Sequence, residues 1–518
     1  MNKNKTYLGL LFAIVLAMYM GLGACGAGII WPDGNGNGNG NGNGGGTTPP
    51  ALVVTHVENT RATETFAAPE GATSYGVSVD GAAWVAFTPT CVLGTCTYIV
   101  PNLNPNELYS VGFRYTTSSA TSAVTNATID TTLQVASFTG GGALGTSLDV
   151  GDVNGDGYPD FIVGPQENDI TDRRAYLFLG GPGNFPPATG ATLTPWATFD
   201  AAALTADLNF PVKLGDINND GIDDALFGEE RMDDPNNGSI HILSGNLTSG
   251  NYDSKLDADW NVVYLGTHVT RFGHSFDIFD DDGDGVNSLI IGAYWFNARR
   301  GQVFQVDGPI TGDVVIGAGN VIFTGAGIND QAGIFVGNVG DIDNDGLDEG
   351  IFTSMVLILG FPEQHTYRFT DNIGAFFGPI TYFNNGSQVG QAYSLIPGWF
   401  ALSGGLSATG GFANVYDQRT DINAPANQLT NDNRPTFGMG MFVADFYPGN
   451  DGVELAVGAV DRVYIYNDFP NISFTADAEL SMPGINVEGA DFNADGYIDF
   501  LVADPTAGGG AGAVYVYY

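Results

Sequence analysis

The chain has 518 residues, enough for roughly three domains of ~150 residues. Its 57 acidic and 16 basic residues give a formal net charge of −41, which excludes nucleic acid as a natural partner and a polybasic membrane patch, because both need clustered Lys and Arg. Glycine is abundant (75 residues), charged residues make up 14% of the chain and aromatic residues 12%. This composition favours a folded, acidic, all-β protein of short strands and tight turns.

Residues 1–24 have the pattern of a signal peptide. Two lysines precede an apolar stretch at residues 7–20 that is short for a membrane span. The following Leu22-Gly23-Ala24-Cys25 resembles the lipobox of bacterial lipoproteins. That resemblance implies cleavage before Cys25, lipidation of Cys25 and, with Gly26 next, an outer-membrane lipoprotein on the surface or periplasmic face of the cell envelope. The alternative is an ordinary signal peptide cleaved after Ala24.

Residues 25–50 are predicted to be a tether. From residue 34 to residue 46 the chain alternates Gly and Asn, so no side chain there can pack. Beyond the tether, Cys91 and Cys96 are the other two cysteines. Because an exported chain meets oxidising conditions and no third metal ligand is near, we predict a disulfide between them that pins a hairpin turn.

Residues 51–131 are predicted to form a small β-sandwich. Residues 74–79 alternate like a strand and end on the turn Asp80-Gly81. Residues 103–109 then lead into a second alternating run that carries Val111, Phe113 and Tyr115. This second run resembles the tyrosine corner and following strand of fibronectin type III domains, which implies a spacer or a ligand-presenting module.

The remainder, residues 132–518, contains a repeated Asp-rich loop followed by an apolar strand. The first four copies start at Asp152, Asp216, Asp280 and Asp341, so successive starts are 64, 64 and 61 residues apart. A fifth copy starts at Asp491. Two degenerate copies at residues 391–399 and 445–458 and seven recurring strands, one of them at residues 356–359, predict seven four-stranded blades of a β-propeller. Residues 133–139 are the expected donor of the last blade's fourth strand.

Each loop is predicted to hold Ca²⁺. Side-chain oxygens at positions 1, 3, 5 and 9 and the carbonyl of position 7 would surround an ion, and Gly at position 6 permits the sharp bend. Position 12 is apolar where an EF-hand needs Glu, and the alternative is a set of plain Asp-Gly hairpin turns. Ser288 stands at position 9 of the third loop, so its site is expected to be weaker. About four or five sites are expected, with these ligands: Asp152, Asn154, Asp156, Tyr158, Asp160; Asp216, Asn218, Asp220, Ile222, Asp224; Asp280, Asp282, Asp284, Val286; Asp341, Asp343, Asp345, Leu347, Glu349; Asp491, Asn493, Asp495, Tyr497, Asp499.

With Phe272-Gly273 before the third loop and Ile291-Gly292-Ala293 after it, residues 132–518 resemble the FG-GAP repeats of integrin α-subunit propellers and their bacterial relatives. The resemblance implies a seven-bladed propeller with Ca²⁺ in the hairpins between strands one and two of several blades. It also implies that partners bind the opposite face. An integrin-like, calcium-stabilised module for adhesion or for protein or glycan recognition is the expected function.

The sequence contains no zinc-protease, nucleophile-elbow or Walker motif, so we expect no enzyme. A carbohydrate-cleaving enzyme and a purely structural scaffold are the alternatives. The candidate ligand contacts are aromatic and arginine residues between strands two and three of the third blade: Tyr294, Trp295, Phe296, Arg299 and Arg300. Flat rings beside guanidinium groups suit an acidic or glycan partner. Packing of these rings between blades is the alternative.

Overall fold

The computed structural model describes most of the chain beyond residue 52. The described residues are 53–57, 62–92, 95–100, 108–118, 120–130, 135–165, 174–182, 190–200, 211–230, 238–265, 269–341, 345–358, 361–369, 377–382, 391–393, 399–404, 411–417, 427–431, 437–446, 453–460, 462–470, 476, 478–480, 482, 484–494 and 498–517. The predicted signal peptide, Cys25 and the tether lie outside these residues. Among the described residues, no helix combines the length and the hydropathy needed to cross a membrane.

The chain divides into two compact units, and the first comprises Met1–Thr132 with residues 187–189. Its described part holds two four-stranded sheets, ordered β1-β2-β6-β5 and β4-β3-β7-β8. Buried Val77, Val100 and Val111 come from both sheets and share one core, so the sheets pack face to face. The strands are β1 (Val53–Val57), β2 (Ala62–Ala67), β3 (Ala72–Val79), β4 (Val85–Phe87), β5 (Thr90–Val92), β6 (Thr95–Val100), β7 (Leu108–Thr117) and β8 (Thr125–Asp130).

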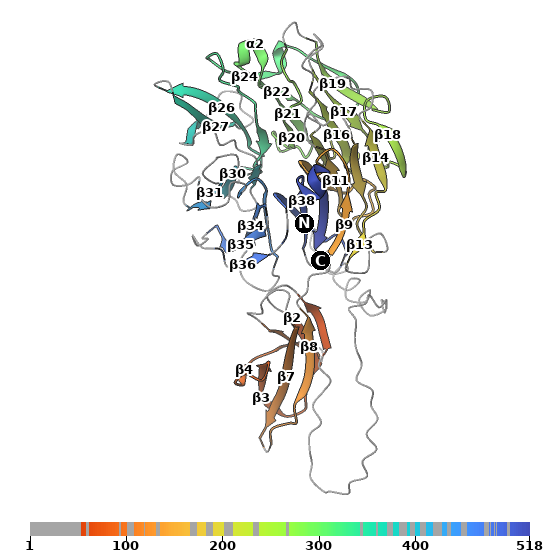
Figure 1. The fold of residues 1–518 in the computed structure, drawn as a ribbon, viewed down its shortest axis with the longest axis vertical. Helices are drawn as coiled ribbons and strands as arrows, with labels where there is room; N and C mark the ends of the chain where they lie inside the picture. Colours follow the sequence, from red (N-terminus) through yellow and green to blue (C-terminus); the bar gives the residue numbers. More distant parts are fainter. Residues whose placement is uncertain are drawn as a thin grey trace, which may run out of the picture. The chain divides into compact units, whose positions relative to one another are not determined.

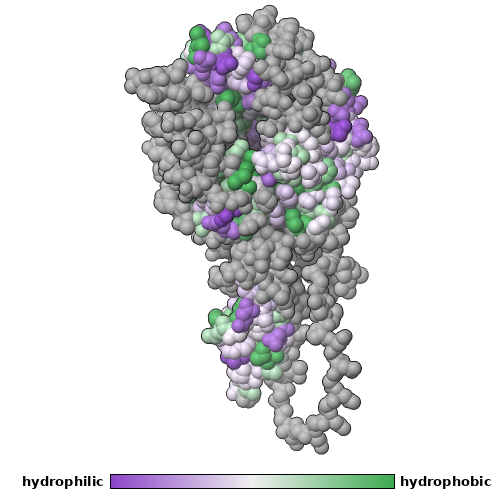
Figure 2. Space-filling model, in the orientation of Figure 1, coloured by the Kyte–Doolittle hydropathy of each residue, from purple (hydrophilic) through white to green (hydrophobic). Residues whose placement is uncertain are grey.

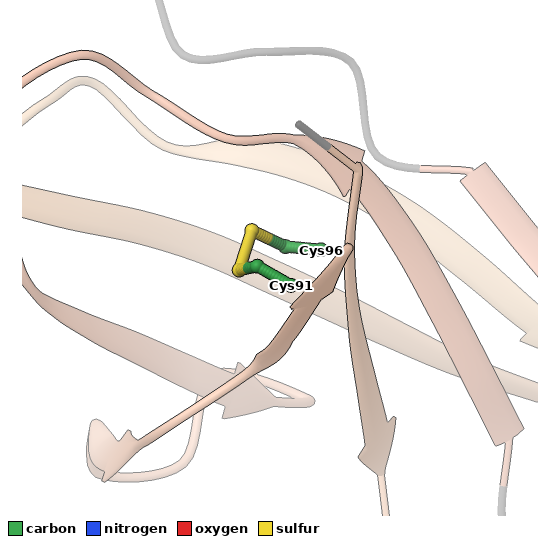
Figure 3. Close-up of a disulfide and its surroundings, with 2 residues drawn as sticks. All are labelled: Cys91 and Cys96. Carbon is green, nitrogen blue, oxygen red and sulfur yellow. A yellow bond between two sulfur atoms is a disulfide. The ribbon is translucent and has the colours of Figure 1, made fainter. Parts of the chain in front are cut away.

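The predicted disulfide is confirmed. Cys91 on β5 and Cys96 on β6 lie directly opposite each other in an antiparallel pair, with Cα atoms 4.0 Å apart, and their sulfurs are bonded (Figure 3). Cys96 is fully buried beside Phe66 and Phe113. The bridge therefore fastens the short strand β5 to the sheet at the edge of the sandwich.

The second unit, Leu133–Pro186 with Gly190–Tyr518, contains seven sheets among its described residues. Each sheet has a core of four antiparallel strands, and we number the sheets 1 to 7. Figure 1 shows the sheets following one another in chain order around a common centre, which is the arrangement of a β-propeller. Sheets 1 to 3 comprise β10 (Ser147–Gly151), β11 (Asp160–Gly164), β12 (Arg174–Phe178), β14 (Ala197–Asp200); β15 (Val212–Gly215), β16 (Asp224–Glu229), β17 (Ser239–Leu243), β19 (Trp260–Tyr264); β20 (Phe276–Phe279), β21 (Ser288–Ala293), β22 (Gln302–Val306), β24 (Val321–Thr324).

Sheets 4 to 6 continue the same up-and-down order. Parallel pairing adds β18 (Gly250–Asp253) to sheet 1 and β23 (Val314–Ile316) to sheet 2. The strands of sheets 4 to 6 are β25 (Val336–Asn338), β26 (Gly350–Ile358), β27 (Phe361–Phe369), β28 (Phe377–Tyr382); β29 (Gln391–Tyr393), β30 (Trp399–Gly404), β31 (Gly411–Asp417), β32 (Asn427–Asn431); β33 (Met441–Ala444), β34 (Val453–Ala459), β35 (Arg462–Phe469), β36 (Ala478–Leu480).

Sheet 7 joins the two ends of the unit. It contains β37 (Asn486–Ala490), β38 (Asp499–Asp504) and β39 (Ala513–Tyr517), and its fourth strand is β9 (Val135–Thr139). β9 pairs antiparallel with β39 from Thr139 opposite Ala513 to Val135 opposite Tyr517, which confirms the expected strand donor. β13 (Ala191–Thr192) adds to β9 in parallel. The ring therefore closes through a strand that precedes sheet 1 in the chain.

The core explains why the second strands are so apolar. Every residue of β11, β16, β21 and β38 is buried, because neighbouring sheets cover both faces of each strand. Large aromatic side chains such as Phe161, Phe227 and Phe352 fill the spaces between sheets. One of the recurring strands was predicted at residues 356–359, as the third strand of sheet 4, and this prediction was wrong. Residues 356–358 are the end of the nine-residue second strand β26, and the third strand is β27. The β26–β27 hairpin is longer than its counterparts, so the apolar residues expected in the third strand lie in the second strand.

Candidate functional site

The Asp-rich loops join the first and second strands of their sheets, and we name them after those sheets: loop 1 (residues 152–160), loop 2 (216–224), loop 3 (280–288), loop 4 (341–349) and loop 7 (491–499). Positions are counted from the first Asp of each loop. Position 6 is a left-handed glycine, with φ of 86° at Gly157, 87° at Gly221, 80° at Gly285 and 93° at Gly346. Only glycine adopts this conformation without steric cost, so the Gly residues set the bend.

The carboxylate at position 1 organises the turn of loops 1 to 4. In loop 1, Asp152 accepts hydrogen bonds from the amides of Asp156 (3.1 Å) and Gly157 (2.8 Å). Asp216 accepts from positions 5 and 6 of loop 2 at 3.1 and 2.7 Å, and Asp341 does so in loop 4 at 3.0 and 2.9 Å. In loop 3, Asp280 accepts from Gly283 and Gly285, both at 2.9 Å. An Asp at position 1 therefore holds the backbone of loops 1 to 4 in the same turn through hydrogen bonds within the loop alone.

The carboxylates of loop 3 converge on one point. Carboxylate oxygens of Asp280, Asp282 and Asp284 all lie within 4.8 Å of one another. Asp282 and Asp284 each use Oδ1 to accept one backbone amide, and their Oδ2 atoms accept no hydrogen bond from the described residues. Two exposed oxygens and a third carboxylate at this spacing match the hard oxygen ligands that Ca²⁺ prefers.

Position 9 anchors the loop to its own sheet. Asp160 is fully buried and accepts hydrogen bonds from the amides of Val153 (3.1 Å) and Gly180 (2.9 Å), the latter just after the third strand. Asp224 accepts from Ile217, Asn218 and Gly245 in the same way, and Asp499 accepts from Phe492 and Asn493. Sequence reasoning assigned these residues to metal binding alone, and the structure gives them a second, structural task.

Loop 3 and sheets 4 and 6 vary this anchor. Ser288 replaces Asp in loop 3, where its Oγ accepts from the amide of Gly308 at 3.4 Å. Glu349 in sheet 4 and Glu454 in the degenerate loop of sheet 6 are fully buried, and Glu454 accepts from the amide of Phe446 at 2.9 Å. The weak carboxylate pattern of sheet 6 therefore keeps its anchor.

The buried carboxylates at position 9 of loops 1 and 2 have raised pKa values. Burial, the largest cause, raises the pKa of Asp160 to about 7; backbone hydrogen bonds lower it, and the charges of Asp156 and Asp152 raise it further. Burial likewise raises the pKa of Asp224 to about 6, with added repulsion from Asp220 and Asp216. In loops 1 and 2 the negative charges at positions 1 and 5 therefore lie close enough to position 9 to repel it, and a bound cation would relieve that repulsion.

Several other predicted ligands, where the structure describes them, form hydrogen bonds within their own loops. Asn218 is buried and donates from Nδ2 to Asp224 (2.9 Å), and Asn493 donates to Asp499 (3.2 Å). Tyr158, Ile222, Val286 and Leu347 each donate their backbone amide to the carboxylate at position 5 of their own loop. Asp343, Asp495 and Tyr497 lie outside the described residues.

The candidate ligand contacts lie at the end of β21 opposite to loop 3, in the short element α2 (Phe296–Arg299). Tyr294 is buried, so it packs beneath this surface and is not exposed on it. Trp295 is half-buried, and the guanidinium carbons of Arg299 and Arg271 each lie 4.3 Å from its ring centroid. Arg271 comes from the segment that precedes β20, and no sequence pattern linked it to Trp295 because the two are separated along the chain by the whole hairpin of loop 3.

A buried ion cluster holds Arg271 in place. Glu230 is fully buried; its Oε1 lies 2.7 Å from Nε of Arg271 and its Oε2 lies 2.6 Å from Nδ1 of His274. Arg271 also donates to the hydroxyl of Tyr294. Sheet 2 thus fixes a guanidinium that supports Trp295 of sheet 3.

The chain is similar to known proteins in three respects. Residues 144–175, which include loop 1, match the family described as FG-GAP repeat. Integrin alpha-5 of Xenopus laevis is 28% identical over 181 residues, which cover 34% of this chain and 16% of the integrin, so the chain spans only a small part of that relative. A solved structure titled "Structure of Dos1 propeller" covers 74% of this chain and 94% of its own, with a TM-score of 0.43 and 10% identity. The chain is therefore similar to FG-GAP repeats over residues 144–175 and similar in part to an integrin α-subunit.

Proposed function

We propose that this chain is a lipid-anchored extracytoplasmic binding protein that recognises a protein or glycan through a seven-bladed FG-GAP propeller stabilised by Ca²⁺. In this proposal residues 1–24 are a signal peptide, lipidated Cys25 attaches the tether to the outer membrane, residues 51–131 are a fibronectin type III-like spacer, and residues 132–518 are the propeller. The strand order of the two N-terminal sheets supports the spacer assignment. The protein has no catalytic role in this proposal.

One observation carries the calcium assignment: loops 1 to 4 share one turn held by the Asp at position 1, and the carboxylates of loop 3 converge on one point. In loop 3 the oxygens of Asp280, Asp282 and Asp284 are within 4.8 Å of one another, a spacing that one cation can bridge. A bound Ca²⁺ supplies positive charge that offsets the mutual repulsion of these carboxylates. The side chains at positions 1, 3 and 5 and the carbonyl at position 7 would hold it, and position 9 would hold the loop.

Thermal unfolding with Ca²⁺, Mg²⁺ or a chelator tests the calcium proposal. An ion that binds only the native state adds ~2.7 kcal/mol per site at a hundredfold excess over Kd. We expect Ca²⁺ to raise the melting temperature well above its value in chelator, and Mg²⁺ to raise it less. The double variant Asp282→Ala/Asp284→Ala should reduce the gain, and Glu70→Ala, an exposed carboxylate of the first unit, should leave it intact. Superimposable melting curves with and without chelator would remove the calcium proposal.

The proposed partner contacts are Trp295, Phe296, Arg299 and Arg300. Neither guanidinium group of Arg299 and Arg300 forms a hydrogen bond or an ion pair with any described residue, so both are available to a partner carboxylate. The turn itself supports this proposal, because Asn297, Ala298 and Arg299 have φ of 45°, 62° and 63°. Left-handed backbone costs ~1–2 kcal/mol per residue that carries a side chain.

Sheet 7 contains the same turn built from glycine. In α3 (Ala507–Gly510) the residues Gly508, Gly509 and Gly510 have φ of 61°, 77° and 100°. Both turns repeat the same backbone hydrogen bonds, from Arg299 to Trp295 (3.3 Å) and from Gly510 to Thr506 (3.2 Å). Sheet 3 therefore places side chains on a strained turn that glycine forms at lower cost, which favours a role for those side chains at the surface.

The glycine turn supplies a clean test of the contact surface. Arg299→Gly removes the guanidinium and reproduces the residue of the equivalent turn, so it should preserve or raise stability. We expect Arg299→Gly/Arg300→Gln and Trp295→Ala to weaken binding to the partners identified on glycan and protein arrays in Ca²⁺ by more than about tenfold, a loss of ~1.4 kcal/mol. Arg114→Gln, an arginine stacked on Trp84 in the first unit, is the matched control. Unchanged array binding by the double variant would exclude this surface.

A further inference from the structure

The residue at position 8 of loops 2, 3 and 4 connects each of these loops to the loop before it. The amide of Asp152 in loop 1 donates to Oδ2 of Asp223 in loop 2 (2.6 Å), and the amide of Asp223 donates back to the carbonyl of Asp152 (3.0 Å). Asp348 of loop 4 makes the same reciprocal pair with Asp280 of loop 3, at 3.3 and 2.8 Å. Between loops 2 and 3, Nδ2 of Asn287 donates to the carbonyl of Asp216 at 2.8 Å. The first residue of loops 1, 2 and 3 is therefore held by the following loop.

Position 7 of the following loop adds packing to the same junction. Ile222 lies over Gly155 of loop 1, where an added Cβ would come within 3.2 Å of the Ile222 side chain. Leu347 lies over Gly283 of loop 3, where an added Cβ would come within 2.8 Å. The carbonyl of position 7 is a proposed metal ligand. The residue at position 7 therefore contributes to the site of its own loop, and its side chain packs against the preceding loop.

The turn after the third strand makes a final contact with the preceding loop. The amide of Asn246 in sheet 2 donates to the carbonyl of Val153 in loop 1 at 3.0 Å. The amide of Ile310 in sheet 3 donates to the carbonyl of Ile217 in loop 2 at 2.9 Å. Position 2 of loops 1 and 2 is thus fixed by the next sheet, and this contact is independent of position 8.

The junction between sheets 7 and 1 lacks the position 8 contact. The corresponding residue of loop 1 is Pro159, which has neither an amide hydrogen nor a polar side chain. The contact to position 2 remains, since the amide of Gly181 donates to the carbonyl of Phe492 at 2.8 Å. Among the described junctions between loops 7, 1, 2, 3 and 4, the position 8 bond therefore cannot form at one and does form at three.

We propose that Asp223, Asn287 and Asp348 are positioning residues that couple metal binding between loops of neighbouring sheets, so that loops 1 to 4 fill cooperatively and loop 7 fills independently. An ion in loop 2 fixes the backbone that presents Asp223, and Asp223 then holds the first ligand of loop 1 in place. The ordering of loop 1 therefore costs less once loop 2 is occupied, which is positive coupling without a larger structural change. This inference rests on the proposed metal binding.

Tyrosine at position 7 provides a probe specific to two loops. Loops 1 and 7 have Tyr158 and Tyr497 at this position, whereas loops 2, 3 and 4 have Ile222, Val286 and Leu347. Tb³⁺ substitutes for Ca²⁺ in oxygen sites and emits when a nearby tyrosine is excited. A Tyr497→Phe protein reports loop 1 through the emission that a further Tyr158→Phe removes, and a Tyr158→Phe protein reports loop 7 in the same manner.

The experiment disables loop 2 with Asp220→Ala and measures Tb³⁺ affinity at the two reporting loops. Coupling predicts affinity at loop 1 that is roughly 5- to 150-fold weaker, and unchanged affinity at loop 7. Asp223→Ala should weaken loop 1 and abolish its response to Asp220→Ala, and Asp223→Asn, which keeps an acceptor oxygen for the Asp152 amide, should restore the response.

Each outcome decides between coupling and its alternatives. Equal losses at loops 1 and 7, or no loss at loop 1, overturn the coupling whether or not Asp223→Ala folds, because the comparison of the two reporters needs only Asp220→Ala. A response of loop 1 that persists in a folded Asp223→Ala protein overturns the role of Asp223. Absence of sensitised emission in every variant contradicts metal binding itself, a result that differs from metal binding without coupling.

Discussion

The carboxylate at position 9 should stabilise the fold even without metal, and Asp224→Ala in chelator is the sharpest test. Asp224 is fully buried and accepts the backbone amides of Ile217 (3.1 Å), Asn218 (3.2 Å) and Gly245 (2.8 Å). An alanine leaves the buried amides of Ile217 and Asn218 without this acceptor, and a buried unsatisfied donor costs ~1–3 kcal/mol. We expect a loss of about 2–6 kcal/mol in the free energy of unfolding, measured by urea denaturation.

Two variants calibrate that measurement. Asp224→Asn keeps one acceptor oxygen and should lose about half as much. Ser288→Ala, at the equivalent position of loop 3, removes a long contact of 3.4 Å to the amide of Gly308 and a side-chain hydrogen bond to Asp281. It leaves one backbone amide without this acceptor instead of three, and it should cost about 1 kcal/mol. If Asp224→Ala and Ser288→Ala cost the same in chelator, the anchoring role of the position 9 carboxylate is refuted. A large difference only in Ca²⁺ would assign Asp224 to metal binding alone.

Three further predictions address other parts of the chain. Glu230→Ala leaves buried Arg271 without its ion pair and should cost ~3–5 kcal/mol by urea denaturation, with Glu70→Ala as the neutral comparison. Burial raises the pKa of Asp149 to about 6, although the positive charge of Lys213 opposes this shift. The folded protein therefore retains a proton that the unfolded chain releases above pH ~4. The free energy of unfolding in chelator should fall as the pH rises from ~4 to ~6, and Asp149→Asn should reduce that fall. Cys25→Ser should release the protein from washed membranes, whereas Cys91→Ser should not, and a Cys25 variant that stays bound contradicts the lipid anchor.

The sequence allowed prediction of features set by local spacing and missed those that join distant residues. The Asp-rich loops, their left-handed glycines and the disulfide depend on residues within a few positions of one another, and so their patterns were visible. Asp223, Asn287 and Asp348 were not identified, because their partners lie 71, 71 and 68 residues away and no local motif marks them. Sheet register failed for the same reason at residues 356–358, where the length of the β26–β27 hairpin depends on tertiary packing.

The candidate ligand surface also combines residues that the sequence marked with a residue that only the fold revealed. Trp295 and Arg299 were predicted as ligand contacts from their residue types, and Tyr294 was grouped with them although it is buried. The contribution of Arg271 required the fold, because Glu230 of sheet 2 sets its position. A charged residue whose partner is on another sheet carries no sequence signal of its task.

The pairing of β9 with β39 sets the order in which this chain can fold. Sheets 1 to 6 are built from nearly consecutive segments and can form as each segment appears, whereas β9 waits for Ala513–Tyr517, more than 370 residues later. Until then β9 and β38 present unpaired edges, which are competent to bind other chains. During synthesis the ring therefore cannot close before β39 is made, and removal of β39 would leave the facing edges of β9 and β38 unpaired.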